Sequence, residues 1–497
     1  MIRPLWTLAE IAAASGGRLE LPEETATPAG DPSKAAPASG PGRDKANAAV
    51  SGVSIDTRTL EPGDLFVPLT DTRDGHEFVA AAFARGAAAA FVRRDYARSA
   101  GDGVLIRVDD PLSALERIGV AARGRLSEKA RVIAVTGSAG KTGTKEMLRA
   151  CLKVCASSPE KVHAPEKSFN NHWGVPLTLA RMRADTEFAV FEIGMNHAGE
   201  IGPLARMVRP HIAIVTNVLP VHVGNFPDGE IGVANAKAEI FEGLQSNSAA
   251  ILPGDSPHFE LLRKAAEAKS ARIISFGLGS KSDVRLAALS GGQSNGLQHV
   301  VADSRRAGRA IGYDLGMFGE HLAVNSLAVV AAVEALGCDA EQATKALAKV
   351  ASAAGRGARA LLRVTGGDVL LLDESYNANP ASMRAALEGL AATDHGGRRV
   401  AVLGDMLELG VDAVRYHEDL KDAAEGADLV LCCGPLMRHL YDVLAPDKRG
   451  AWAPSSTDLI PHVLATLRPG DAVMVKGSLG SRMAPVVEAI RKRFSGD

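Results

Sequence analysis

The segment IAVTGSAGKTGTKE, residues 133–146, combines residue types that could bind a phosphate. An apolar run ends at Thr136, and a glycine-rich turn then leads to Lys141 and Thr142 ahead of a helix-like pattern. Such a turn directs backbone N–H groups and the positive end of a helix dipole at one point. The lysine would add charge for the terminal phosphates of a nucleotide, and the threonine hydroxyl could ligate Mg²⁺. The spacing is G-x-x-G-K-T, shorter than the usual G-x-x-x-x-G-K-[ST], so an ordinary strand-to-helix turn is the alternative.

Three further side chains could complete a cation site. Glu192 ends the apolar run FAVFEIG, and a carboxylate there could join Thr142 at Mg²⁺, unless it is simply a surface glutamate. His222 follows the next apolar run, but a lone histidine is more often structural and Mg²⁺ prefers oxygen. Lys237 lies on a helical pattern in ANAKAEIF, where a solvated lysine is the simplest interpretation because an ammonium cannot ligate a cation.

Amide side chains occur in two places that favour ligand binding. Asn170 and Asn171 lie in the polar loop KSFNNHWGVPLTL and offer donors and acceptors for a sugar or a peptide amide, although turn chemistry alone could explain them. His321 and Asn325 are four residues apart at the start of a helical pattern and therefore share a face. They could contact an adenine, and helix capping is the alternative.

A second group of polar residues lies after a change in the chain's pattern. Arg356 stands between two glycines, where its planar fork could contact a phosphate. The run LLLDESYNANP ends a predicted strand with Asp373 and Glu374 and then bends through Asn377 and Asn379. Ligands of α/β sheets bind at the carboxyl ends of the strands, so this loop is a candidate for ligand contacts.

Alternating apolar runs and helical patterns must position these residues. From residue 130 the runs are RVIAVTG, TEFAVFEIG, HIAIVTNV, AAILPGD and ARIISFG. This alternation predicts a mainly parallel sheet with helices on both faces. After Gly357 the alternation restarts with VLLLDES, RRVAVLGDM, ADLVLCCG and DAVMVKGS, which predicts a Rossmann-like domain.

A smaller α/β unit precedes them, with a helix that begins near Thr7 and strand-like runs in VSGVSIDTRTLEPGDLFVPL. Residues 22–48 are rich in Pro, Ala, Gly and Ser without an apolar period, which predicts a disordered insertion. The predicted fold is therefore α/β with three domains, at residues 1–112, 113–354 and 355–497.

The composition narrows the classes of partner. The 497 residues include 56 Lys and Arg against 58 Asp and Glu, so no charge excess points to nucleic acid or to an anionic membrane. The five cysteines have no metal-ligand spacing, and we expect them to be reduced, with Cys432 and Cys433 buried in an apolar run. No window approaches ~18 consecutive apolar residues. We therefore expect a cytoplasmic protein without a transmembrane segment.

Taken together, these segments resemble the Mur ligase family over nearly the whole chain. The resemblance rests on TGSAGKTGTKE, FNNHWGVPLTL, EIGMNHAGEI, VTNVLPVHV, AKAEIF, GEHLAVNSL, DESYNANPASMRAAL, VLGDMLELG with His417, and VKGSLGSRM. Within the family, YNANP and GDMLELG are similar to the members that add D-alanyl-D-alanine to UDP-MurNAc-tripeptide. One departure is Gly143, which stands where many relatives have Ser or Thr.

The resemblance implies a role for each matching residue. ATP would be bound by Gly137, Ser138, Ala139, Gly140, Lys141, Thr142, Asn325, Arg356, Asp373 and Asn377. Two Mg²⁺ ions would be held by Thr142, Glu192, His222 and Lys237, the last of these as a carbamate. The implied catalytic residues are Lys141, Glu192, His222 and Lys237. The UDP-sugar substrate would be met by Asp56, Thr57 and Arg58, in a segment similar to the family's D-S-R, and by Asn170 and Asn171.

The implied reaction is amide formation through an acyl-phosphate, because a free carboxylate does not condense with an amine at neutral pH. The expected partners are small molecules, with no nucleic acid, and the expected state is a monomer. Three alternatives share the phosphate-binding loop: another acid–amino acid ligase of the folylpolyglutamate synthase type, a different P-loop ATPase, and a nucleotide-binding regulatory module without turnover.

Overall fold

The computed structural model describes residues 4–22, 47–221, 223–291, 297–364, 366–393 and 395–494. His222 and nearly all of the predicted insertion at 22–48 lie outside these residues. The chain divides into two compact units. The first unit consists of Met1–Ala134, Ala156–Ile193 and Gly202–Pro210, and the second of Val135–Cys155, Gly194–Ile201 and His211–Asp497.

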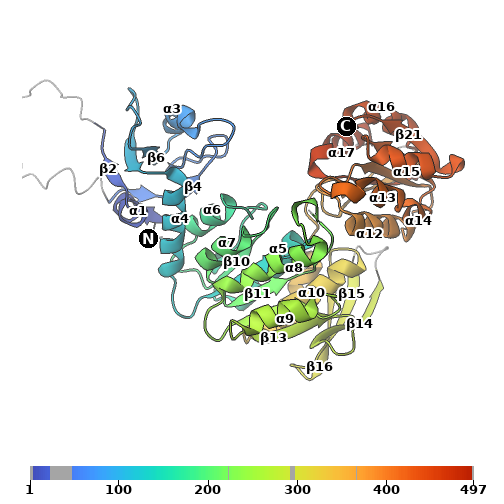
Figure 1. Cartoon of the computed structure of the whole chain (residues 1–497), viewed down its shortest axis with the longest axis horizontal. Helices are drawn as coiled ribbons and strands as arrows, with labels where there is room; N and C mark the ends of the chain where they lie inside the picture. The colour runs from blue at the N-terminus through green and yellow to red at the C-terminus, as the bar shows by residue number, and fades with distance from the viewer. Residues whose placement is uncertain are drawn as a thin grey trace, which may run out of the picture. The chain divides into compact units, whose positions relative to one another are not determined.

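The first unit begins with the predicted small α/β region (Figure 1). Its sheet has the order β2 (Arg18–Glu20), β7 (Val104–Val108), β6 (Ala89–Arg93), β5 (Asp64–Phe66) and β4 (Gly52–Ser54). Neighbours from β4 to β7 are parallel, and β2 is antiparallel to β7. A short ladder pairs β1 (Trp6–Thr7) with β3 (Ala49–Val50). The helices are α1 (Leu8–Ser15), α3 (Val79–Ala84) and α4 (Pro111–Gly124).

The predicted start of the first helix is confirmed by a capping box. Thr7 Oγ1 accepts from Glu10 N at 3.2 Å, and Glu10 Oε2 accepts from Thr7 N at 2.8 Å. The two bonds satisfy backbone donors that the first turn leaves without helical partners. The helix then buries Leu8 and Ile11 in the apolar core of this region.

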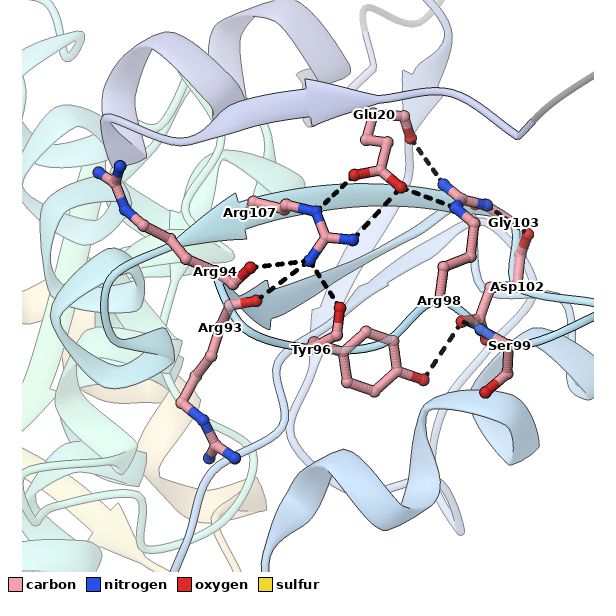
Figure 2. Close-up of polar contacts among 9 residues, drawn as sticks. All are labelled: Glu20, Arg93, Arg94, Tyr96, Arg98, Ser99, Asp102, Gly103 and Arg107. Atoms are coloured by element: carbon pink, nitrogen blue, oxygen red, sulfur yellow. Dashed lines mark hydrogen bonds and ion pairs between the residues drawn. The ribbon is translucent and has the colours of Figure 1, made fainter.

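Edge strand β2 is fixed by the ion pairs of Glu20 (Figure 2). The Glu20 carboxylate accepts from Arg98 Nε at 2.7 Å and from Arg107 Nε. Arg107 also donates to the carbonyl of Tyr96 at 2.8 Å, and the Tyr96 hydroxyl donates to Asp102 at 3.2 Å. These contacts tie β2 to the loop that connects β6 and β7, and they lower the pKa of Glu20 to about 2.

A nine-stranded sheet has the order β16-β15-β14-β13-β12-β11-β8-β10-β9. Its strands are β8 (Arg131–Thr136), β9 (Val162–His163), β10 (Phe188–Glu192), β11 (Ile212–Val215), β12 (Ala249–Pro253), β13 (Arg272–Gly277), β14 (Val284–Gly291), β15 (Gln298–Ser304) and β16 (Arg309–Leu315). All five predicted runs form strands. The pairs β9–β10, β11–β12, β12–β13 and β13–β14 are parallel, as predicted, whereas β15 and β16 add antiparallel pairs that the sequence analysis missed.

The helices of this region are α5 (Lys141–Cys155), α6 (Gly174–Ala180), α7 (Ile201–Val208), α8 (Gly229–Ala238), α9 (Phe259–Glu267), α10 (Glu320–Ala335) and α11 (Ala340–Thr344). Helix α10 is buried along most of its length and packs against α5 and against β13 and β14. It therefore serves as a core helix of the second unit, and α5 carries the phosphate-binding motif at its beginning.

The last sheet confirms the predicted Rossmann-like alternation. Its order is β17 (Ala358–Leu362), β18 (Val369–Glu374), β22 (Ala472–Lys476), β19 (Arg399–Gly404), β20 (Leu429–Cys433) and β21 (Arg449–Ala453), and only β17 is antiparallel to its neighbour. The helices are α12 (Pro380–Ala391), α13 (Ala413–Glu418), α14 (Lys421–Ala424), α15 (Met437–Val443), α16 (Ser456–Thr466) and α17 (Ala484–Phe494).

Apolar clusters cover both faces of this sheet. Because side chains alternate along a strand, Cys432 packs into one cluster and Cys433 into the other. Both thiols are buried, as the sequence predicted. The three larger sheets take their strands from 18–108, 131–315 and 358–476, which agrees with three α/β domains, while the exact boundaries remain a prediction. Across the described residues, no helix is both long and apolar enough to cross a bilayer.

Candidate functional site

The glycine-rich loop joins β8 to α5, as the motif requires, and the segment after β11 holds it. Ser138 N donates to the Asn217 carbonyl at 3.1 Å, and Ala139 N donates to Asn217 Oδ1 at 2.9 Å. Thr216 Oγ1 donates to the Ala139 carbonyl at 2.6 Å. Asn217 and Thr216 therefore fix the loop from inside the second unit. Neither residue was predicted from the sequence to have a role, although both lie in the segment VTNVLPVHV.

Two glycines of the loop cannot be replaced without disturbing it. Gly137 has φ 148° and Gly140 has φ 80°. A Cβ on Gly137 would lie 1.9 Å from Thr216 Oγ1, and one on Gly140 would lie 2.3 Å from Asn325 Nδ2. The loop thus needs glycine for its conformation and for the close approach of α10.

The first turn of α5 supplies the charged and hydroxyl groups. Lys141 Nζ donates to the Gly137 carbonyl at 2.6 Å, so the side chain folds back over the loop. Thr142 is buried, with 6% of its surface exposed. An ammonium above a glycine-rich turn at a helix N-terminus is the arrangement that binds nucleotide phosphates in other P-loop proteins.

Lys237 on α8 is buried, although the simplest interpretation of the sequence was that this lysine is exposed to solvent. It is 3% exposed, and its pKa is lowered well below its ordinary range by burial and then by the charge of Lys141. Both effects disfavour the ammonium form of Lys237.

The two residues of helix α10 that were predicted to bind a ligand, His321 and Asn325, differ in burial. Asn325 is buried and lies against Gly140, so it belongs to the loop region. His321 is exposed. Gly319 occupies the N-cap position of α10, and no side chain caps this helix. Neither His321 nor Asn325 therefore caps the helix, which was the alternative to ligand binding. Their contact with an adenine stays a prediction.

Glu192 and the amide pair belong to the first unit. Asn170 Nδ2 donates to Glu192 Oε1 at 2.8 Å, and Glu192 is 1% exposed, so it is not a surface glutamate. Asn171 Oδ1 accepts from Trp173 N at 3.2 Å and from Gly174 N at 2.9 Å. Asn171 therefore stabilises the turn at the start of α6, as the alternative interpretation of the sequence had it. Asn170 instead orients the buried carboxylate of Glu192.

The segment Asp56–Arg58 forms a turn after β4. The Asp56 carboxylate accepts from Arg58 N at 2.9 Å and from Arg58 Nη2 at 2.7 Å. This pairing lowers the pKa of Asp56. The Arg58 side chain is 88% exposed, so an anionic ligand can reach its charge.

Arg356 stacks on Tyr376, which was not predicted from the sequence, and the predicted Asp373 binds the backbone next to Arg356. Its guanidinium lies 3.7 Å from the ring centroid of Tyr376. Asp373 is buried, and its carboxylate accepts from Gly355 N at 3.0 Å and from the Ser375 hydroxyl at 2.6 Å. Asp373 thus fixes the backbone on either side of the stacked pair.

Asn377 forms a local turn beside a buried lysine. Its Oδ1 accepts from Ala378 N at 2.9 Å, and its carbonyl accepts from Lys476 Nζ at 3.0 Å. Burial lowers the pKa of Lys476, which lies 3.6 Å from Glu374. Asn379 instead caps α12 through Ser382 N at 2.9 Å.

A cavity of about 250 Å³ opens at the carboxyl ends of β19, β20 and β21. The residues that line it include Asp405, Cys433, Gly434, Ser455, Ser481 and Arg482. Asp405 is buried, which raises its pKa, and it accepts from Met437 N at 2.7 Å. None of these residues was predicted from the sequence to bind a ligand, although Asp405 lies in the motif VLGDMLELG and Ser481 and Arg482 lie in VKGSLGSRM. Their position at strand ends was the available signal.

His417 binds the backbone next to Asp405, which lines this cavity. Its Nε2 accepts from Met406 N at 3.0 Å, and its Nδ1 donates to the Ala413 carbonyl at 2.6 Å. Only the neutral imidazole can make both bonds, and burial lowers the pKa of His417 accordingly. The histidine of the GDMLELG motif is therefore a positioning residue for the turn after β19.

A metal site made of protein side chains alone is absent from the part of the chain that the structure describes, since no three His, Cys, Asp or Glu residues gather there. A Mg²⁺ ion would need oxygen from the Thr142 hydroxyl, from a carboxylate and from the nucleotide itself. Those donors are the ones the sequence predicted, apart from His222.

Comparisons with known proteins point to one group of relatives. Family models match residues 135–333, as Mur ligase middle domain, and 358–479, as Mur ligase, glutamate ligase domain. The UDP-N-acetylmuramoyl-tripeptide–D-alanyl-D-alanine ligase of Bacillus subtilis is 34% identical, over 88% of this chain and 93% of the relative. The ligase of that name from Rickettsia prowazekii is 31% identical, over 88% and 94%. A crystal structure of MurF from Acinetobacter baumannii has a TM-score of 0.80 at 28% identity, over 99% of each chain.

Proposed function

This chain belongs to the Mur ligase family, and on that premise we propose that it joins D-alanyl-D-alanine to UDP-N-acetylmuramoyl-tripeptide at the expense of ATP. The enzymes of this family form amide bonds with ATP. The observation that carries the proposal is the loop from Gly137 to Thr142, whose two glycines permit the close approach of Thr216 and Asn325.

The reaction must first convert a carboxylate into an acylating group. A carboxylate oxygen of the tripeptide attacks the γ-phosphorus of ATP, the bond to the β–γ bridging oxygen breaks, and ADP departs. The neutral amine of D-alanyl-D-alanine then attacks the acyl carbon, loses a proton, and expels inorganic phosphate. Lys141 stabilises charge on the transferred phosphoryl group, an effect that contributes several kcal/mol in such sites.

Mg²⁺ fits the residues in part. Thr142 and Glu192 would hold one ion and His222 would serve a second, where the metal neutralises phosphate charge. The hydrogen bond from Asn170 to Glu192 orients that carboxylate.

A carbamate on Lys237 would convert a side chain that cannot ligate a cation into one that can. A neutral amine adds to CO₂ and releases a proton, and the product carries two oxygens and a negative charge. The lowered pKa of the buried Lys237 keeps the amine nucleophilic. The resulting anion would be attracted to the ammonium of Lys141, and its oxygens would supply cation ligands.

We assign the two other substrates to different surfaces. The exposed charge of Arg58 suits the diphosphate of the UDP-sugar. The cavity at β19–β21 suits D-alanyl-D-alanine, a small zwitterion, because it offers Arg482 for the carboxylate and Asp405 for the ammonium. Its volume of about 250 Å³ is at the small end of ligand sites.

In the cell the enzyme would work in the cytoplasm, where its nucleotide substrates are found. A monomer suffices for the proposal, because every residue assigned above comes from one chain. Cell fractionation tests the location of the enzyme, and sedimentation tests its monomeric state.

The decisive experiment is a substrate-omission assay. ADP and phosphate should be released only when ATP, UDP-MurNAc-tripeptide and D-alanyl-D-alanine are all present. Lys141→Ala should abolish release, whereas Lys153→Ala, a change at an exposed lysine of the same helix, should not. ATP hydrolysis without the other substrates would favour a different ATPase. Release with folate and glutamate instead would favour a ligase of the folylpolyglutamate synthase type, and nucleotide binding without turnover a regulatory module.

A further inference from the structure

The side chain of Gln298 bridges two backbone groups in the turn that leads into α10. Its Nε2 donates to the Met317 carbonyl at 2.6 Å, and its Oε1 accepts from Gly319 N at 3.2 Å. Met317 comes after β16, which ends at Leu315, and Gly319 comes directly before α10, which begins at Glu320. A buried amide on β15 therefore binds backbone groups that lie between the neighbouring strand and the helix.

The same turn has little freedom at its first residue and an uncapped helix at its last. A Cβ on Gly316 would lie 2.7 Å from the carbonyl oxygens of Ala348 and Val350, so the backbone is packed closely there. Gly319 has φ 116° and is the N-cap of α10, and no side chain caps this helix. Gln298 thus fixes the backbone at the point where α10 begins.

The turn and the beginning of α10 contact the nucleotide loop and the helix that follows it. A Cβ on Gly143, in the first turn of α5, would lie 3.2 Å from Met317 Cε and 3.6 Å from Leu322 Cδ2. A Cβ on Gly140 would lie 2.3 Å from Asn325 Nδ2. Because these contacts are close, a shift of the start of α10 would change the space in which the loop binds a nucleotide.

Strand β15 is tied to α10 a second time, far from the loop. Ser304 Oγ donates to Glu334 Oε2 at 2.8 Å, and both residues are buried. Gln298 is the first residue of β15 and Ser304 is the last, while Glu334 lies in the last turn of α10. Glu334 is nine residues beyond Asn325, about 13 Å along the helix axis. The strand therefore offers two ties to one helix, of which one lies beside the nucleotide loop.

We propose that Gln298 is a positioning residue for ATP, acting through the start of α10. The inference rests on the proposed function, in which the loop from Gly137 to Thr142 binds ATP. Without the amide, the buried Met317 carbonyl loses this hydrogen bond, and the turn shifts toward other partners. Met317 and Asn325 then move against α5 and the loop, so the affinity for ATP falls.

The test compares Gln298→Met with Ser304→Ala in the full chain. Methionine has nearly the shape of glutamine but no amide, so the variant removes both hydrogen bonds and keeps the packing. Both variants should lower Tm, because each leaves a buried group without a hydrogen-bond partner. Gln298→Met should raise the Kd for ATP, measured by calorimetry, about tenfold, whereas Ser304→Ala should leave it within about twofold.

A milder variant and a second measurement accompany this comparison. The amide of Gln298→Asn is one methylene too short to reach both groups, and the Kd for ATP should rise about threefold. In the absence of nucleotide, hydrogen–deuterium exchange of peptides that span 316–325 should be faster in both Gln298 variants than in Ser304→Ala.

The outcomes separate this inference from the proposed function. An unchanged Kd for ATP in the Gln298 variants would overturn the inference and leave the proposed function intact. Equal losses of affinity in Gln298→Met and Ser304→Ala would also overturn it, since they would reflect a general loss of stability. A wild-type chain that binds no ATP would overturn the proposed function and this inference together.

Discussion

Asn325 lies so close to Gly140 that a methyl group on the glycine would come within 2.3 Å of Asn325 Nδ2. The residues are far apart in the sequence, one in the loop before α5 and the other in the second turn of α10. Their contact means that α10 forms one wall of the nucleotide loop. The shape of the loop therefore depends on helix packing as well as on its own glycines.

Gly140→Ala should weaken ATP binding strongly. A residue other than glycine at φ 80° costs about 1–2 kcal/mol, and the new methyl group must also displace Asn325. We expect the Kd for ATP, measured by calorimetry, to rise at least about tenfold.

Gly143→Ala is the matched control for this change. Gly143 lies in the first turn of α5, where a Cβ would meet the flexible end of Met317 at 3.2 Å and the end of the Leu322 side chain at 3.6 Å, an ordinary contact distance. Alanine gains up to about 1 kcal/mol of helix propensity, so Tm should rise and the Kd for ATP should stay within about twofold. Equal affinities of the two variants for ATP would show that the contact with Asn325 does not shape the loop.

Lys237→Ala should lose most of the ligase activity, about a hundredfold or more, because the oxygens of the proposed carbamate are lost. Formate or acetate should restore part of the rate by placing a carboxylate in the vacated space. In the unmodified protein, ¹³C-labelled bicarbonate should give a carbamate resonance that the variant lacks. A variant with nearly normal turnover would rule out the carbamate, and Lys153→Ala should not respond to acetate.

Arg482→Ala should raise the KM for D-alanyl-D-alanine by about tenfold or more, since it removes the one cation that lines the cavity. The KM values for ATP and for the UDP-sugar should not change, because their proposed sites use other residues. Arg415→Ala, at an exposed arginine on α13, is the control. An unchanged KM for the dipeptide would place its site elsewhere.

Glu20→Gln should reduce stability at neutral pH by about 1–2 kcal/mol, through loss of the ion pairs with Arg98 and Arg107 (Figure 2). The pKa of Glu20 is about 2 in the folded protein against an ordinary value of 4.5. A carboxylate with a lowered folded pKa contributes stability that is fully present above pH 4.5 and is lost as the pH falls toward about 2.

The difference between wild type and Glu20→Gln in urea unfolding should therefore be constant above pH 5 and shrink below 4.5. The exposed pair of Arg73 and Glu77 offers a control, and Glu77→Gln should change stability by less than about 0.5 kcal/mol at any of these pH values. A difference for Glu20→Gln that does not depend on pH would contradict the ion-pair explanation.

The strands and the phosphate loop were readable from the sequence because local signals specify them. Each predicted apolar run became a strand, and the glycines and Lys141 occur where a strand-to-helix turn must hold a nucleotide. The antiparallel strands β15 and β16 were missed, although their side chains alternate between buried and exposed. That alternation indicates a strand, but it does not identify the neighbour with which the strand pairs.

The roles of individual polar residues were decided by tertiary structure, because a side chain's partner is set by what packs beside it. Sequence alone could not distinguish Asn170, which orients Glu192, from Asn171, which starts α6. It could not tell that Lys237 is buried beside Lys141, nor that Thr216 and Asn217 hold the loop. Local spacing in the sequence determined where the chain turns and where its ionisable residues stand. Burial and long-range contacts determined how the pKa values of those residues shift and which side chains and backbone groups they bind.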